Sequence, residues 1–181
     1  SFRSKKNKVL VNNQQSSFTL YSQFSEPSGN LQSLGVSFDT SKVKKKIKLN
    51  QTNINNQSQI AHLLPVVSID PESYLFIDKG PQYRRSFLDW LVFHVKQEYL
   101  QAWTQTMRCH KQLNALYKSK NRQGAIEWEQ QYIKYANQIN LFRKEVFNQL
   151  KRKVLKKTGD FLPEVLGFDV SYFQGWSKEL S

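Results

Sequence analysis

The chain has 181 residues, about 39% of them hydrophobic, and a formal net charge of +13. A core of that size needs neither disulfides nor metal, and the one cysteine, Cys109, cannot form an internal disulfide. No stretch approaches the roughly 18 consecutive apolar residues of a membrane span, so the composition excludes a membrane-spanning or disulfide-rich secreted domain. The charge favours a polyanionic partner, nucleic acid first and an anionic membrane surface second.

The first part of the chain predicts antiparallel β structure between residues 8 and 50. Apolar residues alternate with polar ones in two runs, which hold Phe18, Leu20, Phe24 and then Leu34, Val36, Phe38. The segment from Glu26 to Asn30 between them is typical of a turn, and residues 46–49 predict a third strand. We expect one face of this sheet to be solvated.

The next segments are short. Residues 58–64 predict a helix that Pro65 ends, and residues 66–69 predict a buried strand. Asp70-Pro71-Glu72 predicts a short helical turn with proline near its start.

Two long apolar stripes at three- and four-residue steps follow, from Leu88 to Tyr117 and from Ile126 to Val154. The polar break at residues 118–124 predicts that they form an antiparallel helical hairpin. The second helix is expected to end at residues 158–160, with Gly159 as a C-terminal signal. Residues 166–173 alternate like a further strand.

The segment from residue 71 to residue 89 carries the most specific local signal. Gly80-Pro81 predicts a helix start, which places Arg84 and Arg85 just past the first turn, where positive charge opposes the helix dipole. Two arginines there indicate a nearby anion, either a carboxylate of the same chain or a phosphate, and anchoring by a carboxylate is favoured. The simpler alternative is a surface pair between Arg85 and Asp89, worth about 0.2–0.5 kcal/mol.

Pro71-Glu72, a spacer, Gly80-Pro81 and then Arg84-Arg85-Ser86-Phe87-Leu88-Asp89 resemble the signature of the RecF family of bacterial DNA replication and repair proteins. Further runs resemble the family along essentially the whole chain: Ser1-Phe2-Arg3-Ser4, Phe93-His94, residues 111–116, Phe161-Leu162-Pro163-Glu164 and Gly175-Trp176. Two positions depart from the family pattern. Lys79 stands where the family usually has a second glycine, and Leu113 stands where it has an arginine.

The resemblance implies an α+β fold. Residues 1–80 would be the antiparallel β portion of an ABC/SMC-like ATPase head, residues 81–160 a long antiparallel helical hairpin arm, and residues 161–181 a strand returning to the head. It also implies a cytoplasmic protein that binds ATP, Mg²⁺ and DNA, and that dimerises with ATP. Such a protein, a weak DNA-dependent ATPase, would act at gaps, duplexes and single-strand/double-strand junctions. It would work with RecO and RecR to help load RecA in recombinational repair, replication restart and the SOS response.

The 181 residues contain no Gly-x-x-x-x-Gly-Lys-Ser/Thr loop, and no apolar run ends in paired acids. The chain also begins without Met, so we expect a piece of a longer protein, with the phosphate loop before Ser1 and the signature and Walker B segments after Ser181. Alone, this piece is expected to bind no ATP and to have no catalytic residue.

The candidate DNA-binding residues are cations: Arg3, which would also lie near the ATP site, Lys44, Lys45, Lys46, Lys48, Arg84 and Arg85. Lysines on an edge strand can instead serve only to prevent edge pairing. The histidines and Cys109 lack metal-ligand spacing, and His94 is expected to be a packing residue. The alternative function is a basic protein-interaction module, built on the helical hairpin, without direct DNA contact.

Overall fold

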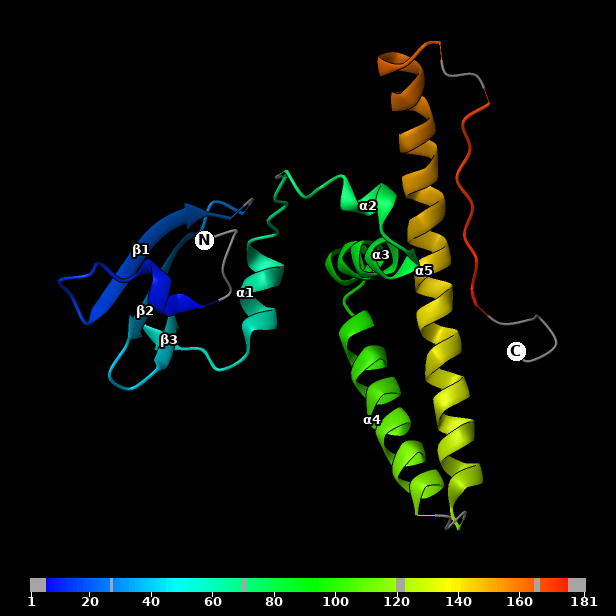
Figure 1. Cartoon of the computed structure of the whole chain (residues 1–181), viewed down its shortest axis with the longest axis horizontal. Coiled ribbons are helices and arrows are strands. Elements are labelled where there is room, and N and C mark those ends of the chain that lie inside the picture. The colour runs from blue at the N-terminus through cyan, green and yellow to red at the C-terminus, as the bar shows by residue number, and fades with distance from the viewer. Residues whose placement is uncertain (1–5, 27, 70, 120–122, 165–166, 176–181) are drawn as a thin grey trace. The chain divides into compact units, whose positions relative to one another are not determined.

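The computed structural model describes residues 6–26, 28–69, 71–119, 123–164 and 167–175 (Figure 1). The chain divides between Glu72 and Ser73 into two compact units, a β unit and a helical unit. The predicted boundary lay after residue 80. The assignment of the two units to a head and an arm stays a prediction.

The β unit is built on a four-stranded antiparallel sheet in the order β1-β2-β3-β4. Its strands are β1 (Ser17–Ser25), β2 (Leu31–Asp39), β3 (Lys44–Leu49) and β4 (Thr52–Asn53). A 3₁₀ helix, η1 (Asn7–Leu10), precedes them and helix α1 (Gln57–Leu63) follows, capped by the Asn56 side chain, which accepts from the Ser58 amide at 3.0 Å. The three predicted strands, the turn after β1 and the short helix are confirmed, whereas residues 8–10 of the predicted β region belong to η1.

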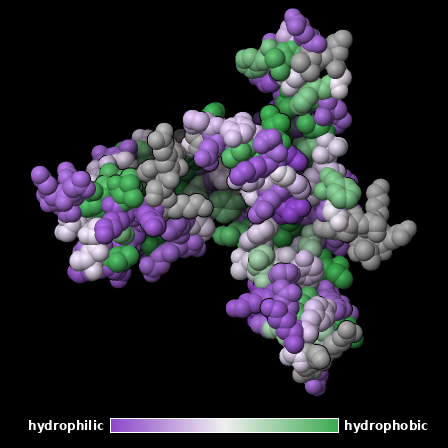
Figure 2. Space-filling model, in the orientation of Figure 1, coloured by the Kyte–Doolittle hydropathy of each residue, from purple (hydrophilic) through white to green (hydrophobic). Residues whose placement is uncertain are grey.

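Alternation along the strands separates an apolar face from a polar one. Phe18 lies opposite Phe38, and Leu20, Val36 and Ile47 form the next row across the sheet. Phe38 and Ile47 are buried. The opposite face carries serine, threonine and lysine side chains, as predicted for a solvated face. Hydrophilic side chains also dominate the side of the β unit seen in Figure 2.

The predicted buried strand at residues 66–69 is wrong. The segment is not in a strand, and Val66, Val67 and Ile69 are 73%, 62% and 88% exposed. A short apolar run forms a strand only where a neighbour pairs with it, and none of the four strands does so here. The turn that follows residue 70 leads into the short helix α2 (Leu75–Asp78).

The helical unit contains α2, α3 (Pro81–Val95), α4 (Tyr99–Lys118) and α5 (Ala125–Phe161). Helices α4 and α5 form the predicted antiparallel hairpin (Figure 1): the ring of Tyr99 lies 6.5 Å from that of Phe142, and the hydroxyl of Tyr117 donates to Glu129 near the turn.

The first apolar stripe is two helices rather than one, because the chain turns between Val95 and Tyr99 with Lys96 in an extended conformation. The turn lets α3 and α4 present apolar side chains to one surface of α5. The resulting core contains Leu88, Val92, Tyr99, Ala102, Ile139 and Val146.

The C-terminal part of the unit departs from the sequence prediction. Helix α5 continues through Gly159 to Phe161, so Gly159 does not end it. Residues 167–175 are not in a strand; the segment lies along α5, where Tyr172 donates to Asn140 at 2.8 Å and Lys151 pairs with Asp169 at 2.6 Å. The alternation arose from packing on a helix. Leu166 lies outside the described residues, and a return of residues 161–181 to the head stays a prediction.

One carboxylate, that of Asp89 on α3, joins three helices of this unit. Arg143 of α5 donates to it twice, at 2.6 Å and 2.9 Å, and the Tyr99 hydroxyl of α4 donates to it at 2.7 Å. The side chains of Arg143 and Asp89 are only 13% and 18% exposed. The planar guanidinium therefore makes a two-point bond in a largely dehydrated setting, where such bonds are strong.

We expect Arg143→Ala to lower the free energy of unfolding by about 3 kcal/mol, because it leaves the Asp89 carboxylate without its counterion in a mostly buried site. Arg152→Ala is the matched control, since Arg152 is an exposed residue of the same helix, and its effect should stay within about 0.5 kcal/mol. Urea unfolding of the two variants measures the difference. Equal unfolding midpoints would show that the pair does not hold the helices together.

The pH dependence of stability provides a second prediction. Burial, and then donation to Asp89, hold the pKa of Tyr99 well above its ordinary value of about 10. Above about pH 10 the unfolded chain loses the hydroxyl proton of Tyr99, while the folded chain keeps it. The contribution of this hydroxyl to the free energy of unfolding is therefore complete below about pH 10 and declines as the pH rises. Tyr99→Phe should therefore lose less stability than the parent between about pH 9 and pH 11. Urea unfolding at each pH measures this difference. If the free energy of unfolding declined equally in Tyr99→Phe and in the parent, the raised pKa of Tyr99 would be contradicted.

Candidate nucleic-acid interface

Three of the four predicted β3 cations lie on one face of the sheet. Side chains alternate along a strand, so Lys44, Lys46 and Lys48 share the polar face, while Lys45 lies on the apolar face opposite Phe38. All four lysines are exposed. The sequence cluster is thus divided by the strand into a row of three cations and one cation on the opposite side.

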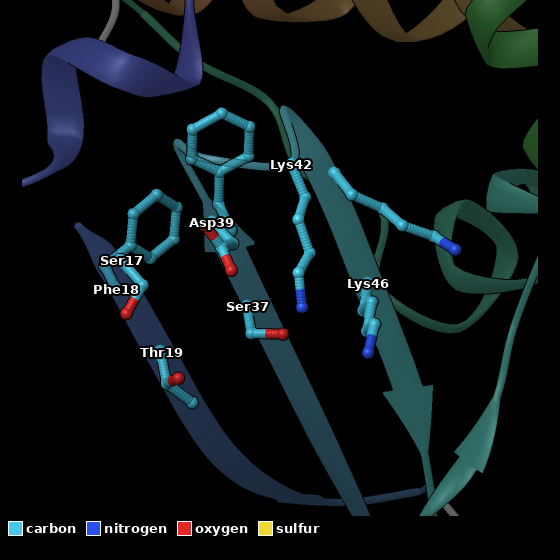
Figure 3. A pocket seen from close by; sticks show the side chains of 9 residues that line it. Ser17, Phe18, Thr19, Ser37, Asp39, Lys42 and Lys46 are labelled. Atoms are coloured by element: carbon cyan, nitrogen blue, oxygen red, sulfur yellow. The ribbon is translucent and has the colours of Figure 1, made fainter.

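Hydroxyl groups stand beside these lysines in the same rows. Lys46 lies opposite Ser37, which lies opposite Thr19, and Figure 3 shows the Ser37 hydroxyl between Thr19 and Lys46. A hollow of about 220 Å³ lies at this end of the sheet, lined by Ser17, Phe18, Thr19, Ser37, Phe38, Asp39, Lys42, Lys44 and Lys46. Ammonium and hydroxyl groups in this arrangement are the donors that contact phosphate oxygens in nucleic-acid complexes.

Asp39 is the one acid among the residues that line this hollow. Its Oδ1 accepts from the Ser41 hydroxyl at 2.6 Å and from the Ser41 amide at 2.8 Å. These bonds, the hydroxyl first, hold the pKa of Asp39 below its usual value, so the group is ionised at neutral pH. Three lysines against one carboxylate leave the hollow positive.

The same lysines lie on a largely open edge. β3 pairs with β2 along its length but with β4 only at Lys48 and Leu49. Charged side chains on such an edge discourage pairing with another sheet. The geometry therefore supports both predicted roles of the lysines, and only binding measurements separate them.

The predicted arginines have different environments. Arg3 lies outside the described residues. Arg84 donates to the carbonyl oxygens of Phe76, Ile77 and Lys79, at 3.3, 3.3 and 3.0 Å, and Arg85 is exposed and makes no hydrogen bond or ion pair with a described residue. Within the described ranges neither arginine pairs with a carboxylate, and the predicted anchor is replaced at Arg84 by main-chain carbonyl oxygens at the end of α2.

Sequence reasoning missed the residue that does pair with Asp89. Arg143 is 54 positions away in the chain, and only the hairpin brings the two together. It also missed the Ser37 and Thr19 hydroxyls, which strand register places beside Lys46. The alternation of the three strands was the available signal, but the register had to be known as well.

Other sequence candidates have structural roles. The ring of His94 lies 4.6 Å from that of Trp90 and 5.0 Å from that of Phe93, which confirms a packing role. Within the described ranges, no three His, Cys, Asp or Glu side chains gather to hold a metal ion. None of the helices in the described part of the chain has the length and hydropathy to cross a membrane.

Comparison with known proteins gives no matching protein-family model but close curated relatives. DNA replication and repair protein RecF of Teredinibacter turnerae is 36% identical over 183 residues, covering 98% of this chain and 48% of the relative. The RecF proteins of Pseudomonas syringae pv. tomato and Haemophilus influenzae (strain 86-028NP) are 32% and 34% identical over 99% and 98% of the chain, and 49% of each relative is covered. The chain spans about half the length of the curated relatives it matches.

Two solved structures share the fold. They are described as the recombination mediator protein RecF-ATPrS and RecF-ATP in the RecFOR pathway, with TM-scores of 0.75 and 0.76 and identities of 21% and 20%. Each match covers 90% of this chain and 45% of the solved chain. The likeness confirms the predicted α+β fold class, an antiparallel sheet followed by a helical hairpin. On the curated relatives and this shared fold, the chain belongs to the RecF family.

Proposed function

We propose that the chain is the central section of a DNA-binding RecF protein that acts in recombinational repair of gapped DNA and in replication restart. The relatives are named for DNA replication and repair, and the similar structures for the RecFOR pathway. The observation that carries the proposal is the row of Lys44, Lys46 and Lys48 on an exposed sheet face lined with hydroxyl groups.

This face binds DNA through phosphates. Lysine ammonium groups release the counterions that surround a nucleic acid, which supplies affinity without sequence information. Asp39 does not cancel the effect, because its carboxylate is outnumbered by Lys42, Lys44 and Lys46 at the hollow. Arg85 remains a further candidate for a phosphate contact. The guanidinium of Arg84 instead donates to main-chain carbonyl oxygens at the end of α2 and so stabilises the fold.

In the parent protein, ATP and Mg²⁺ bind in the other half of the molecule, because these 181 residues contain no phosphate loop. The parent is then a weak DNA-dependent ATPase of the cytoplasm that forms ATP-dependent homodimers. It binds single-strand/double-strand junctions, takes part in the SOS response, and works with RecO and RecR to help load RecA. The names of the similar proteins support ATP binding and the link to RecO and RecR, and the other assignments rest on the family resemblance.

The second candidate function is a protein-interaction module without DNA contact. The open edge of β3 favours it, because lysines placed there only to prevent edge pairing need no ligand. The two functions differ in salt dependence. Phosphate contacts make the logarithm of affinity fall linearly with the logarithm of salt concentration, by roughly 0.9 per neutralised phosphate for duplex DNA.

Two lysines on opposite faces of β3 test the proposal. Lys46→Gln should weaken duplex binding by the 181-residue chain and flatten its salt slope by about one unit, because one phosphate contact is lost. Lys45→Gln removes the same charge from the other face and should leave the slope unchanged. Fluorescence anisotropy across a salt series gives both slopes. Equal effects of the two changes, or no salt-dependent binding by the parent, would favour the interaction module.

DNA binding by this face should also be independent of sequence. The lysines reach phosphates rather than base edges, so unrelated duplexes of equal length should compete equally well. Competition with a labelled duplex measures this directly. A preference beyond about tenfold for one duplex, about 1.4 kcal/mol, would indicate base readout and contradict the phosphate-only contact.

A further inference from the structure

An aromatic ring stands on the same polar face as the lysines. Tyr21 of β1 lies opposite Gly35 of β2, and Gly35 lies opposite Lys48 of β3, so the three form one row across the sheet. Tyr21 is 67% exposed and makes no ring contact with another described residue. Its hydrophobic surface therefore faces solvent beside a row of cations.

The middle of this row is open. Gly35 has no side chain, and a β-carbon placed on it would meet no atom within 4 Å. Neighbouring strands lie about 4.8 Å apart, so the backbones of Tyr21 and Lys48 are separated by about 10 Å. Between the ring and the ammonium group there is thus a flat floor of main chain, wide enough for a planar group to lie against the ring.

We propose that the polar face of the β1–β2–β3 sheet is a platform for single-stranded nucleic acid. One base stacks on Tyr21 over Gly35, and Lys44, Lys46 and Lys48 contact the phosphates of the same strand. The proposal rests on the DNA-binding function proposed above and specifies its ligand at the same site.

The lysine row suits an extended strand. Alternate residues of β3 place Lys44, Lys46 and Lys48 at intervals of about 6.6–6.8 Å in a straight line. This row tracks one sugar-phosphate backbone rather than two. The hydroxyls of Ser37 and Thr19, one row from Tyr21, add donors between the ring and the lysines.

The ring distinguishes a single strand from a duplex. In a duplex the faces of the bases are stacked on one another, whereas an unpaired base can turn out and stack on an aromatic side chain. The tyrosine hydroxyl can donate to a phosphate in either ligand, but only an unpaired base offers its face to the ring. Tyrosine is also common in strands for its packing, and in that case removing the ring would change no binding.

The test uses the 181-residue chain with three probes of equal length: oligo-thymidine, the corresponding abasic oligonucleotide and a duplex. Tyr21→Ser should weaken oligo-thymidine binding by about fivefold or more, the lower end of one base–aromatic stack, and Tyr21→Phe should retain it. Binding of the abasic strand and of the duplex should change less than about twofold, since phosphate contacts remain. Leu20→Ser, on the opposite face of β1, is the control and should leave all three affinities unchanged.

The outcomes separate the two proposals. If Lys46→Gln weakens binding while Tyr21→Ser lowers the affinities for thymidine and abasic strands equally, or not at all, the stacking platform is overturned and the phosphate site stands. If neither change affects any probe, the DNA-binding function itself is overturned. Should Tyr21→Ser fail to fold, Tyr21→Trp provides the measurement: its fluorescence must be quenched by oligo-thymidine beyond the parent's quenching and not by the abasic strand. Equal quenching by both would overturn the platform.

Discussion

The helical unit depends on the carboxylate of Asp89. It accepts from Arg143 and Tyr99, so three helices meet at one charge that would be costly to leave unpaired. The Trp103 ring, with its centroid 5.8 Å from the guanidinium of Arg143, completes the enclosure. Apolar packing alone would bring α3, α4 and α5 together, but the fork of two bonds from Arg143 fixes how α3 lies against the hairpin.

In the β unit a single geometric constraint creates both the core and the candidate interface. Side chains alternate across a sheet, so the register that buries Phe38 and Ile47 also directs Lys44, Lys46 and Lys48 to the opposite face. A slip of one residue would bury lysines and expose the apolar residues. The apolar core thus maintains the arrangement of the cations, although no lysine belongs to it.

The parts of the structure that follow local periodicity could be predicted from the sequence. The strands around Phe38 and the hairpin of α4 and α5 are examples, because one face of each element is buried along its length. Features set by distant partners could not. No residue near Asp89 in the sequence indicates that Arg143 is its partner. The turn at Lys96 is also hidden in the sequence, because the apolar stripe continues on both sides of it. Residues 66–69 have the apolar pattern of a buried strand, but none of the four strands pairs with them, so the local pattern alone gave a wrong prediction.

The position of a cation decides whether it needs an external partner. Two lysines of α5 have acidic partners: Lys151 pairs with Asp169, and Lys157 pairs with Asp160. On β3 only Lys44 lies opposite an acid of β2, which is Asp39, whereas Lys46 and Lys48 lie opposite Ser37 and Gly35. The charge of Lys46 and Lys48 is therefore balanced mainly by solvent ions, and these are the counterions that a nucleic acid backbone displaces. For this reason the lysines of β3 are better candidates for binding DNA than the two paired lysines of α5.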